Sequence, residues 1–213
     1  TRCNLKCEGC YYFEGGSTHH LSPEADEGAW SRFFAAEAAR GVSMAYFVGA
    51  EPALAPKRIM AAAPYFPWGN IGTNGTIRIP KDAPFRIGVS VWAGDDAEDR
   101  TLRGASVFRK ALRNYAGDPR AIMLFTVSRW SMHQIDAVAR MCADNGVPLT
   151  FNLYSPTRSY LQKLAAGQPR DDRFFRVSSG ADTPMLEAED LRRIHGALGE
   201  AMDRHPDTVI YSH

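Results

Sequence analysis

Three of the four cysteines of this 213-residue chain lie within its first ten positions, at Cys3, Cys7 and Cys10. The Asn, Glu and Gly residues between them favour a loop over a helix, and a loop can bring three thiolates to one metal centre. Structural zinc sites and ferredoxin-type clusters use four protein ligands. Three thiolates therefore predict an iron–sulfur cluster in which one iron keeps an open position. A structural zinc site and a redox dithiol are the alternatives.

The remaining cysteine, Cys142, shares one face of an expected helix with apolar residues, which indicates a buried side chain. This uneven distribution does not suit a disulfide framework, so we expect a reducing, cytoplasmic environment. His19 and His20 lie in a segment rich in Gly and Ser, where a solvated loop is a simpler interpretation than a metal site.

Composition excludes several classes of function. The 25 Lys and Arg residues balance 24 Asp and Glu residues, and no window collects basic residues, which argues against a nucleic-acid or polybasic membrane surface. No apolar run approaches the roughly 20 residues of a membrane span, and the beginning lacks a signal-peptide pattern. With 45% hydrophobic residues, the chain can close one core. We expect a single domain over residues 1–213, cut from a longer protein because the first residue is Thr.

Helices and strands are expected to alternate along the chain. Capping and periodicity predict helices at residues 22–41, with Ser22 as N-cap and Pro23 in the first turn, and at 55–63, 98–115, 131–145 and 187–205. Strands are predicted at residues 42–49, 68–75, 85–94, 121–128, 147–156 and 208–212, the first of them buried on both faces.

This alternation predicts a parallel sheet wrapped by helices, an α/β fold. An open Rossmann-type sheet and a full or partial barrel both satisfy the pattern. In each of them, ligands bind at the carboxyl ends of the strands. The long polar segment at residues 167–184 is expected to be a lid or a surface excursion.

The C-x3-C-x2-C spacing resembles the signature of the radical S-adenosylmethionine (SAM) superfamily. The resemblance implies a [4Fe-4S] cluster held by Cys3, Cys7 and Cys10, with SAM chelating the fourth iron. It implies a partial (β/α)6 barrel whose first strand precedes Thr1. It also implies reductive cleavage of SAM to a 5′-deoxyadenosyl radical, which abstracts hydrogen from an organic substrate.

Further segments match the family in order, from residue 3 to about residue 154. FVGAEPAL resembles the GGEP element, where backbone groups and Glu51 hold the methionine amino group. Ala50 replaces the second glycine, and we expect a negative φ there to accommodate its methyl group. IGTNGT resembles the TNG element, and SVWAGDDAEDRTLRG resembles a fourth-strand block of peptide-modifying and molybdopterin-type members. The resemblance thus implies SAM contacts at Gly49, Ala50, Glu51, Pro52, Asn74, Ser90, Arg103, Asn152 and Leu153, the last two beside the adenine.

Two positions depart from the family pattern. Gly9 stands where the family usually has an aromatic residue before the third cysteine, so Tyr11 or Tyr12 is expected to cover the adenine instead. The usual Asp of the fourth-strand block is Ala93, or is displaced to Asp95.

Three of the implied contacts also have simpler interpretations. Asn74 begins an Asn-Gly turn dipeptide, Ser90 could bond to backbone, and Arg103 could form surface ion pairs.

We therefore expect an enzyme that starts a radical reaction on an organic substrate. One candidate substrate is a peptide, and the other is a small molecule such as a lipid, a sugar or a cofactor precursor. The expected partners are SAM, the substrate and a reductant such as flavodoxin or ferredoxin. A non-catalytic iron–sulfur or zinc-binding protein is the alternative from a different class.

Overall fold

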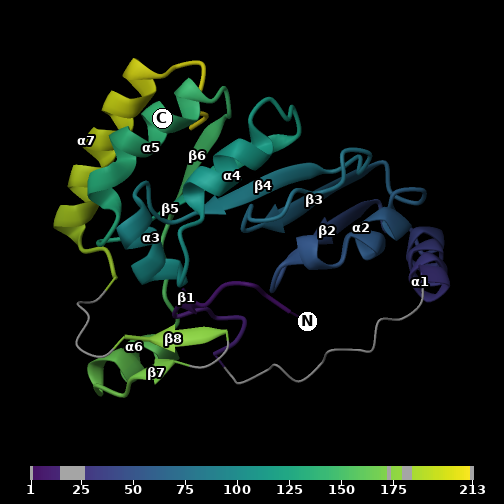
Figure 1. Cartoon of the computed structure of the whole chain (residues 1–213), viewed down its shortest axis with the longest axis horizontal. Coiled ribbons are helices and arrows are strands. Elements are labelled where there is room, and N and C mark those ends of the chain that lie inside the picture. The colour runs from purple at the N-terminus through teal and green to yellow at the C-terminus, as the bar shows by residue number, and fades with distance from the viewer. Residues whose placement is uncertain (1, 15–26, 172–173, 179–183, 212–213) are drawn as a thin grey trace.

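A computed structural model of the chain describes residues 2–14, 27–171, 174–178 and 184–211. Five of its strands form one parallel sheet with the order β2-β3-β4-β5-β6. This confirms the predicted α/β fold with parallel strands and helices between them (Figure 1). The five strands are β2 (Met44–Phe47), β3 (Trp68–Thr73), β4 (Arg86–Val91), β5 (Ala121–Val127) and β6 (Leu149–Leu153).

Each strand of this sheet pairs with the next one along the chain. A doubly wound fold requires a point at which the strand order reverses, and the five strands contain none, so their winding is that of a barrel. The helices are α1 (Glu27–Ala39), α2 (Pro56–Ala62), α3 (Asp96–Arg103), α4 (Phe108–Tyr115), α5 (Ile135–Asp144), α6 (Arg158–Ala165) and α7 (Ala188–Arg204), with two 3-10 turns, η2 (Pro52–Leu54) and η3 (Met132–Gln134).

The core lies between the sheet and the helices that cover one of its faces. Ile71, Ile87, Met123 and Phe125 point into it from successive strands and are fully buried. The expectation that the first of these strands is buried on both faces is wrong, since Tyr46 of β2 is 63% exposed. The same face is also exposed at Asn70, which pairs with Tyr46 on the neighbouring strand β3, so only the other face of this part of the sheet is buried.

Several expected elements differ in extent. The single helix expected at residues 98–115 is two helices, because Gly104 takes a left-handed φ of 77° that ends α3. The Asp99 carboxylate then accepts hydrogen bonds from the backbone N–H groups of Val107 and Phe108 at the start of α4. The expected last strand is reduced to one bridge between Leu149 and Val209. Helix α6 was not predicted from the sequence.

The first expected helix is seen over Glu27–Ala39. Its predicted cap at Ser22 and Pro23, and the two histidines His19 and His20, lie outside the described residues.

A second, three-stranded sheet joins the cysteine loop to the polar segment near the C-terminus. β1 (Cys7–Glu8) pairs in parallel with β8 (Phe175–Val177), which pairs antiparallel with β7 (Arg170–Asp171). Figure 1 shows β1 below the main sheet, beside β8 and α6. Because Phe175 and Val177 are buried, this part of the segment covers the cysteine loop as a lid would and is not a surface excursion.

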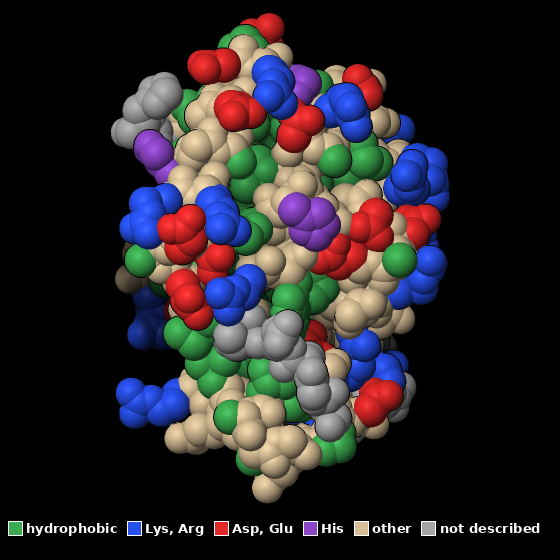
Figure 2. Space-filling view, turned by 90° about the vertical axis from the view of Figure 1, so that its left-hand side faces the viewer, with side chains coloured by type: hydrophobic (Ala, Val, Ile, Leu, Met, Phe, Trp, Pro, Cys, Tyr) green, Lys and Arg blue, Asp and Glu red, His purple; other side chains and the backbone are tan. Residues whose placement is uncertain are grey.

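The surface agrees with the balanced composition. On the face seen in Figure 2, which includes α7, basic and acidic side chains are interspersed and neither sign collects into a patch. A search of the described residues finds no helix with the length and apolar character needed to cross a bilayer.

Candidate functional site

The cysteine loop sits against a small apolar cluster of its own, separate from the main core. Cys3 and Cys10 pack against this cluster, which contains Phe13, Tyr160, Phe174, Phe175 and Val177. Burial raises the pKa of Cys3 and raises that of Cys10 to about 11, and the negative charge of Cys7 raises both further. The three free thiols are therefore close enough to repel one another as thiolates, which a cationic centre would relieve.

The donor set of this loop is three free thiols. A structural zinc site uses four protein ligands. A [4Fe-4S] cluster binds its thiolates through separate irons, so three of them leave one iron open. Three soft sulfur donors in one partly buried loop are therefore chemically suited to such a cluster.

Three backbone hydrogen bonds fix the loop from different sides. Lys6 N donates to Arg103 O at the end of α3 (3.1 Å), and Gly9 N donates to Arg176 O in β8 (2.9 Å). Glu51 N donates to Arg2 O (3.0 Å), which places the GAEP segment beside Cys3. The last of these bonds brings the start of the cysteine loop to the carboxyl end of β2, where the sequence predicted a ligand site.

The Glu51 side chain is buried, and both of its carboxylate oxygens accept hydrogen bonds from within the protein. One carboxylate oxygen accepts hydrogen bonds from Thr73 Oγ1 (2.6 Å) and Ala53 N (2.9 Å), and the other accepts from Asn74 N (2.7 Å). Glu51 thus joins the end of β2 to the end of β3. The structure gives this residue a positioning role, and a direct contact with a methionine amino group stays a prediction.

The backbone just before Glu51 takes two successive left-handed conformations. Gly49 has a φ of 85°, and a side chain there would meet the ring of Tyr12 at 2.5 Å. Ala50 has a φ of 35°, so the expected negative φ is wrong. Alanine rarely adopts this region because of its Cβ, and such strain is commonly retained at ligand-binding turns. Pro52 follows as the first residue of η2.

Asn74 belongs to a closed ring of hydrogen bonds that contacts the first cysteine. Its Nδ2 donates to Asn4 Oδ1 (2.8 Å), Asn4 Nδ2 donates to Thr76 Oγ1 (2.7 Å), and Thr76 Oγ1 donates to Asn74 Oδ1 (2.6 Å). Asn74 Nδ2 also lies 3.9 Å from Cys3 Sγ. Asn74 is therefore held beside Cys3, and its contact with SAM stays a prediction.

Unpartnered polar atoms gather on the sheet side of the loop. Of the buried side-chain N and O atoms in the described parts of the chain, four have no hydrogen-bond partner, and three of these are Arg103 Nε, Asp99 Oδ1 and Tyr154 Oη. Arg103 is 3% exposed, and its Nη1 donates to Ser90 O at 2.6 Å. Burial raises the pKa of Asp99, and the charge of Arg103 opposes this rise. Two of these groups, Arg103 and Tyr154, flank Trp92.

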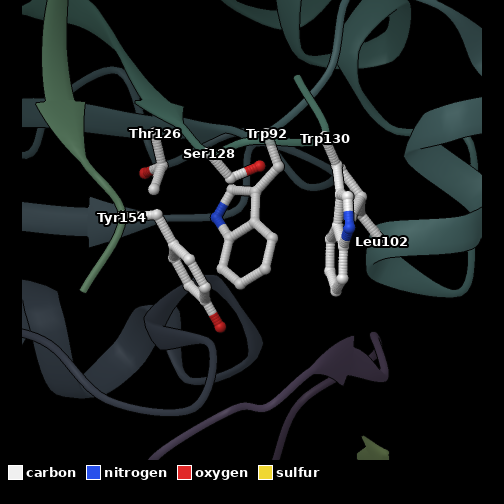
Figure 3. A pocket seen from close by; sticks show the side chains of 6 residues that line it. All are labelled: Trp92, Leu102, Thr126, Ser128, Trp130 and Tyr154. Carbon is white, nitrogen blue, oxygen red and sulfur yellow. The ribbon is translucent and has the colours of Figure 1, made fainter. Parts of the chain in front are cut away.

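Trp92 stands between the two flanking groups. Its ring centroid lies 5.9 Å from the Arg103 guanidinium carbon and 5.4 Å from the Tyr154 ring. Figure 3 shows the Tyr154 hydroxyl pointing away from the sheet, on the side where β1 lies. Burial raises the pKa of Tyr154, and the charges of Glu8, Cys7 and Cys10 raise it further, which places its hydroxyl near the cysteine loop.

A narrow, nearly filled pocket adjoins these groups at the ends of β4, β5 and β6. It is lined by Trp92, Leu102, Thr126, Ser128, Trp130 and Tyr154 (Figure 3). The remaining residues predicted to contact SAM lie on the same sheet. Ser90 presents its carbonyl to Arg103, whereas Asn152 and Leu153 are exposed at the end of β6, the edge strand opposite β2.

Several residues whose hydrogen bonds hold the cysteine loop were not predicted from the sequence. Asn4 and Glu8 lie inside the cysteine motif, where their polar character between ligands was an available signal. Tyr160 and Ser178 bind Glu8 from segments far along the chain, and no local pattern marks them. Asp99, which caps α4, was read as part of a continuous helix.

We predict that Ala50→Gly raises the free energy of unfolding by about 0.5–1 kcal/mol, because glycine adopts a φ of 35° without the Cβ penalty. The control is Ala55→Gly, since Ala55 has a φ of −132° that alanine adopts freely. That substitution should lower the stability by a similar amount. Chemical denaturation of the three proteins measures both effects, and a loss of stability in Ala50→Gly would contradict the assigned strain.

No protein-family model matches the sequence, and no match was found among curated proteins. Solved structures of SuiB from Streptococcus suis resemble the chain with a TM-score of 0.68 at 15% identity, covering 100% of this chain and 47% of SuiB. SuiB bound to S-adenosylmethionine and SuiB bound to the precursor peptide SuiA give the same TM-score, at 15% and 14% identity. The chain thus spans about half the length of SuiB and has the fold of that half.

Proposed function

We propose that the protein is a radical SAM enzyme whose cluster is held by Cys3, Cys7 and Cys10. The observation that carries the proposal is the pair of unpartnered buried atoms, Arg103 Nε and Tyr154 Oη, beside the cysteine loop. A buried polar atom without a partner is costly, so its persistence points to a polar ligand. A ligand with a carboxylate and hydroxyl groups, as SAM has, would satisfy both atoms.

The chain's own residues would bind and orient the cofactors. Arg103 would pair with the methionine carboxylate, and the backbone of residues 49–51, fixed by the Glu51 hydrogen bonds, would hold the amino group. The aromatic residues Phe13, Phe174 and Phe175 would keep water from the loop. When bound, the reduced cluster supplies the electron that cleaves SAM to methionine and a 5′-deoxyadenosyl radical, which takes hydrogen from the substrate.

The proposed substrate is a peptide. The support is the likeness to SuiB, which has been solved with the precursor peptide SuiA, together with the fourth-strand segment that resembles peptide-modifying members. Because the chain spans about half of SuiB, this assignment rests on the fold and that segment alone. We further propose a cytoplasmic setting and a small reductant such as flavodoxin or ferredoxin, since such a cluster needs a low-potential electron.

The cysteine assignment predicts cluster loading and SAM cleavage. After anaerobic reconstitution, the protein should hold about four irons and, with dithionite and SAM, release 5′-deoxyadenosine. Cys7→Ala should lose the iron and the product, whereas Cys142→Ala should keep both, because Cys142 is buried in the main core. Iron analysis and chromatography measure these outcomes. A loaded cluster that yields no 5′-deoxyadenosine would instead support a non-catalytic iron–sulfur protein.

The Arg103 assignment predicts a specific loss of SAM affinity. Arg103→Met should raise the Kd of SAM at least tenfold, because a charge-assisted hydrogen bond contributes about 1.5–3 kcal/mol. Arg100→Met is the matched control, since Arg100 is exposed on the same helix. Anaerobic calorimetry on the reconstituted proteins measures both constants. Equal affinities in the two variants would exclude Arg103 as the carboxylate partner.

A further inference from the structure

A buried carboxylate lies inside the cysteine loop. Glu8 is 1% exposed and occupies the position directly after Cys7, in β1. Its Oε1 accepts hydrogen bonds from Tyr160 Oη (2.8 Å) and Ser178 N (2.7 Å), and its Oε2 accepts one from Ser178 Oγ (2.8 Å). These hydrogen bonds tie β1 to α6 and to the residue that follows β8.

The direct partners of the Glu8 carboxylate are neutral donors. Within the described ranges Glu8 forms no ion pair, and Arg176, which stands opposite it in the β1–β8 pairing, donates to the carbonyl oxygens of Lys6 and Thr101 instead. A charge in a buried environment acts more strongly on its neighbours than one in water. Nearby net charge is one of the factors that set the potential of an iron–sulfur cluster.

Glu8 also determines which ring covers the middle of the cysteine loop. Gly9 has a φ of 58°, and a Cβ there would meet the Tyr160 ring at 2.9 Å. The Tyr160 ring therefore packs on Gly9, the position at which the sequence lacks an expected aromatic residue. The hydroxyl of the same ring is held by Glu8. Tyr160 of α6 thus places an aromatic ring over Gly9, and its hydrogen bond to Glu8 holds that ring in place.

We propose that Glu8 is a positioning residue with an electrostatic effect on the cluster. Its carboxylate fixes α6 and β8 over the cysteine loop, and its charge lowers the reduction potential of the cluster. The second part rests on the proposed function, because it requires a cluster at Cys3, Cys7 and Cys10. Reduction adds negative charge to the cluster, which a neighbouring carboxylate opposes. The cluster thereby becomes a stronger reductant.

Glu8→Gln tests the charge with little change of shape. The glutamine Oε1 can still accept from Tyr160 and Ser178 N, and its Nε2 can donate to Ser178 Oγ. A redox titration of the reconstituted protein followed by electron paramagnetic resonance should show a more positive midpoint potential in Glu8→Gln. Tyr160→Phe removes one hydrogen bond and keeps the charge, so its potential should not become more positive. Equal midpoint potentials in Glu8→Gln and the unmodified protein would overturn the electrostatic effect.

Hydrogen exchange of the protein before reconstitution tests the anchoring without a cluster. Glu8→Ala should exchange faster than the unmodified protein in α6 and β8, whereas Glu8→Gln should keep most of the protection. Unchanged exchange in Glu8→Ala would overturn the anchoring role. If the unmodified protein accepts no cluster at all, the proposed function and the electrostatic effect both fail, while the exchange result still decides the anchoring.

Discussion

The cost of charging thiols in a partly buried loop is the constraint on which the site depends. Cys3 and Cys10 pack against an apolar cluster, and burial raises the pKa of both, so their thiolates are costly without a compensating charge. The proposed iron–sulfur cluster would supply that compensating charge. The loop must then be held in place by the rest of the protein, because its own residues favour no regular structure.

The barrel supplies that support through the ends of its strands. Glu51 ties the end of β2 to the end of β3, and Asn74 ties β3 to the loop through Asn4. On the other side, Glu8 ties the loop to α6 and β8. The backbone strain at Ala50 lies where these supports meet, and the hydrogen bonds of Glu51 offset its cost. The unpartnered atoms of Arg103 and Tyr154 are the groups that the proposed function assigns to a ligand.

The parts of this site that depend on local sequence could be predicted, and those that depend on distant contacts could not. The cysteine spacing, the Glu51 strand end and the parallel sheet follow from short patterns. Tyr160 lies 152 residues from Glu8, so no window contains both residues. The φ of Ala50 depends on the packing of the loops around it, and the exposure of Tyr46 depends on which face of the sheet the rest of the chain covers. The break at Gly104 could have been found from glycine's preference for helix ends.

Mössbauer spectroscopy of the protein reconstituted with ⁵⁷Fe, recorded with and without SAM, tests the central claim most directly. If three thiolates leave one iron open, about a quarter of the iron signal should move to a site of higher coordination when SAM is added, while the other irons stay unchanged. A spectrum with four irons that SAM leaves unaltered would contradict the account, because every iron would then already have its full set of ligands.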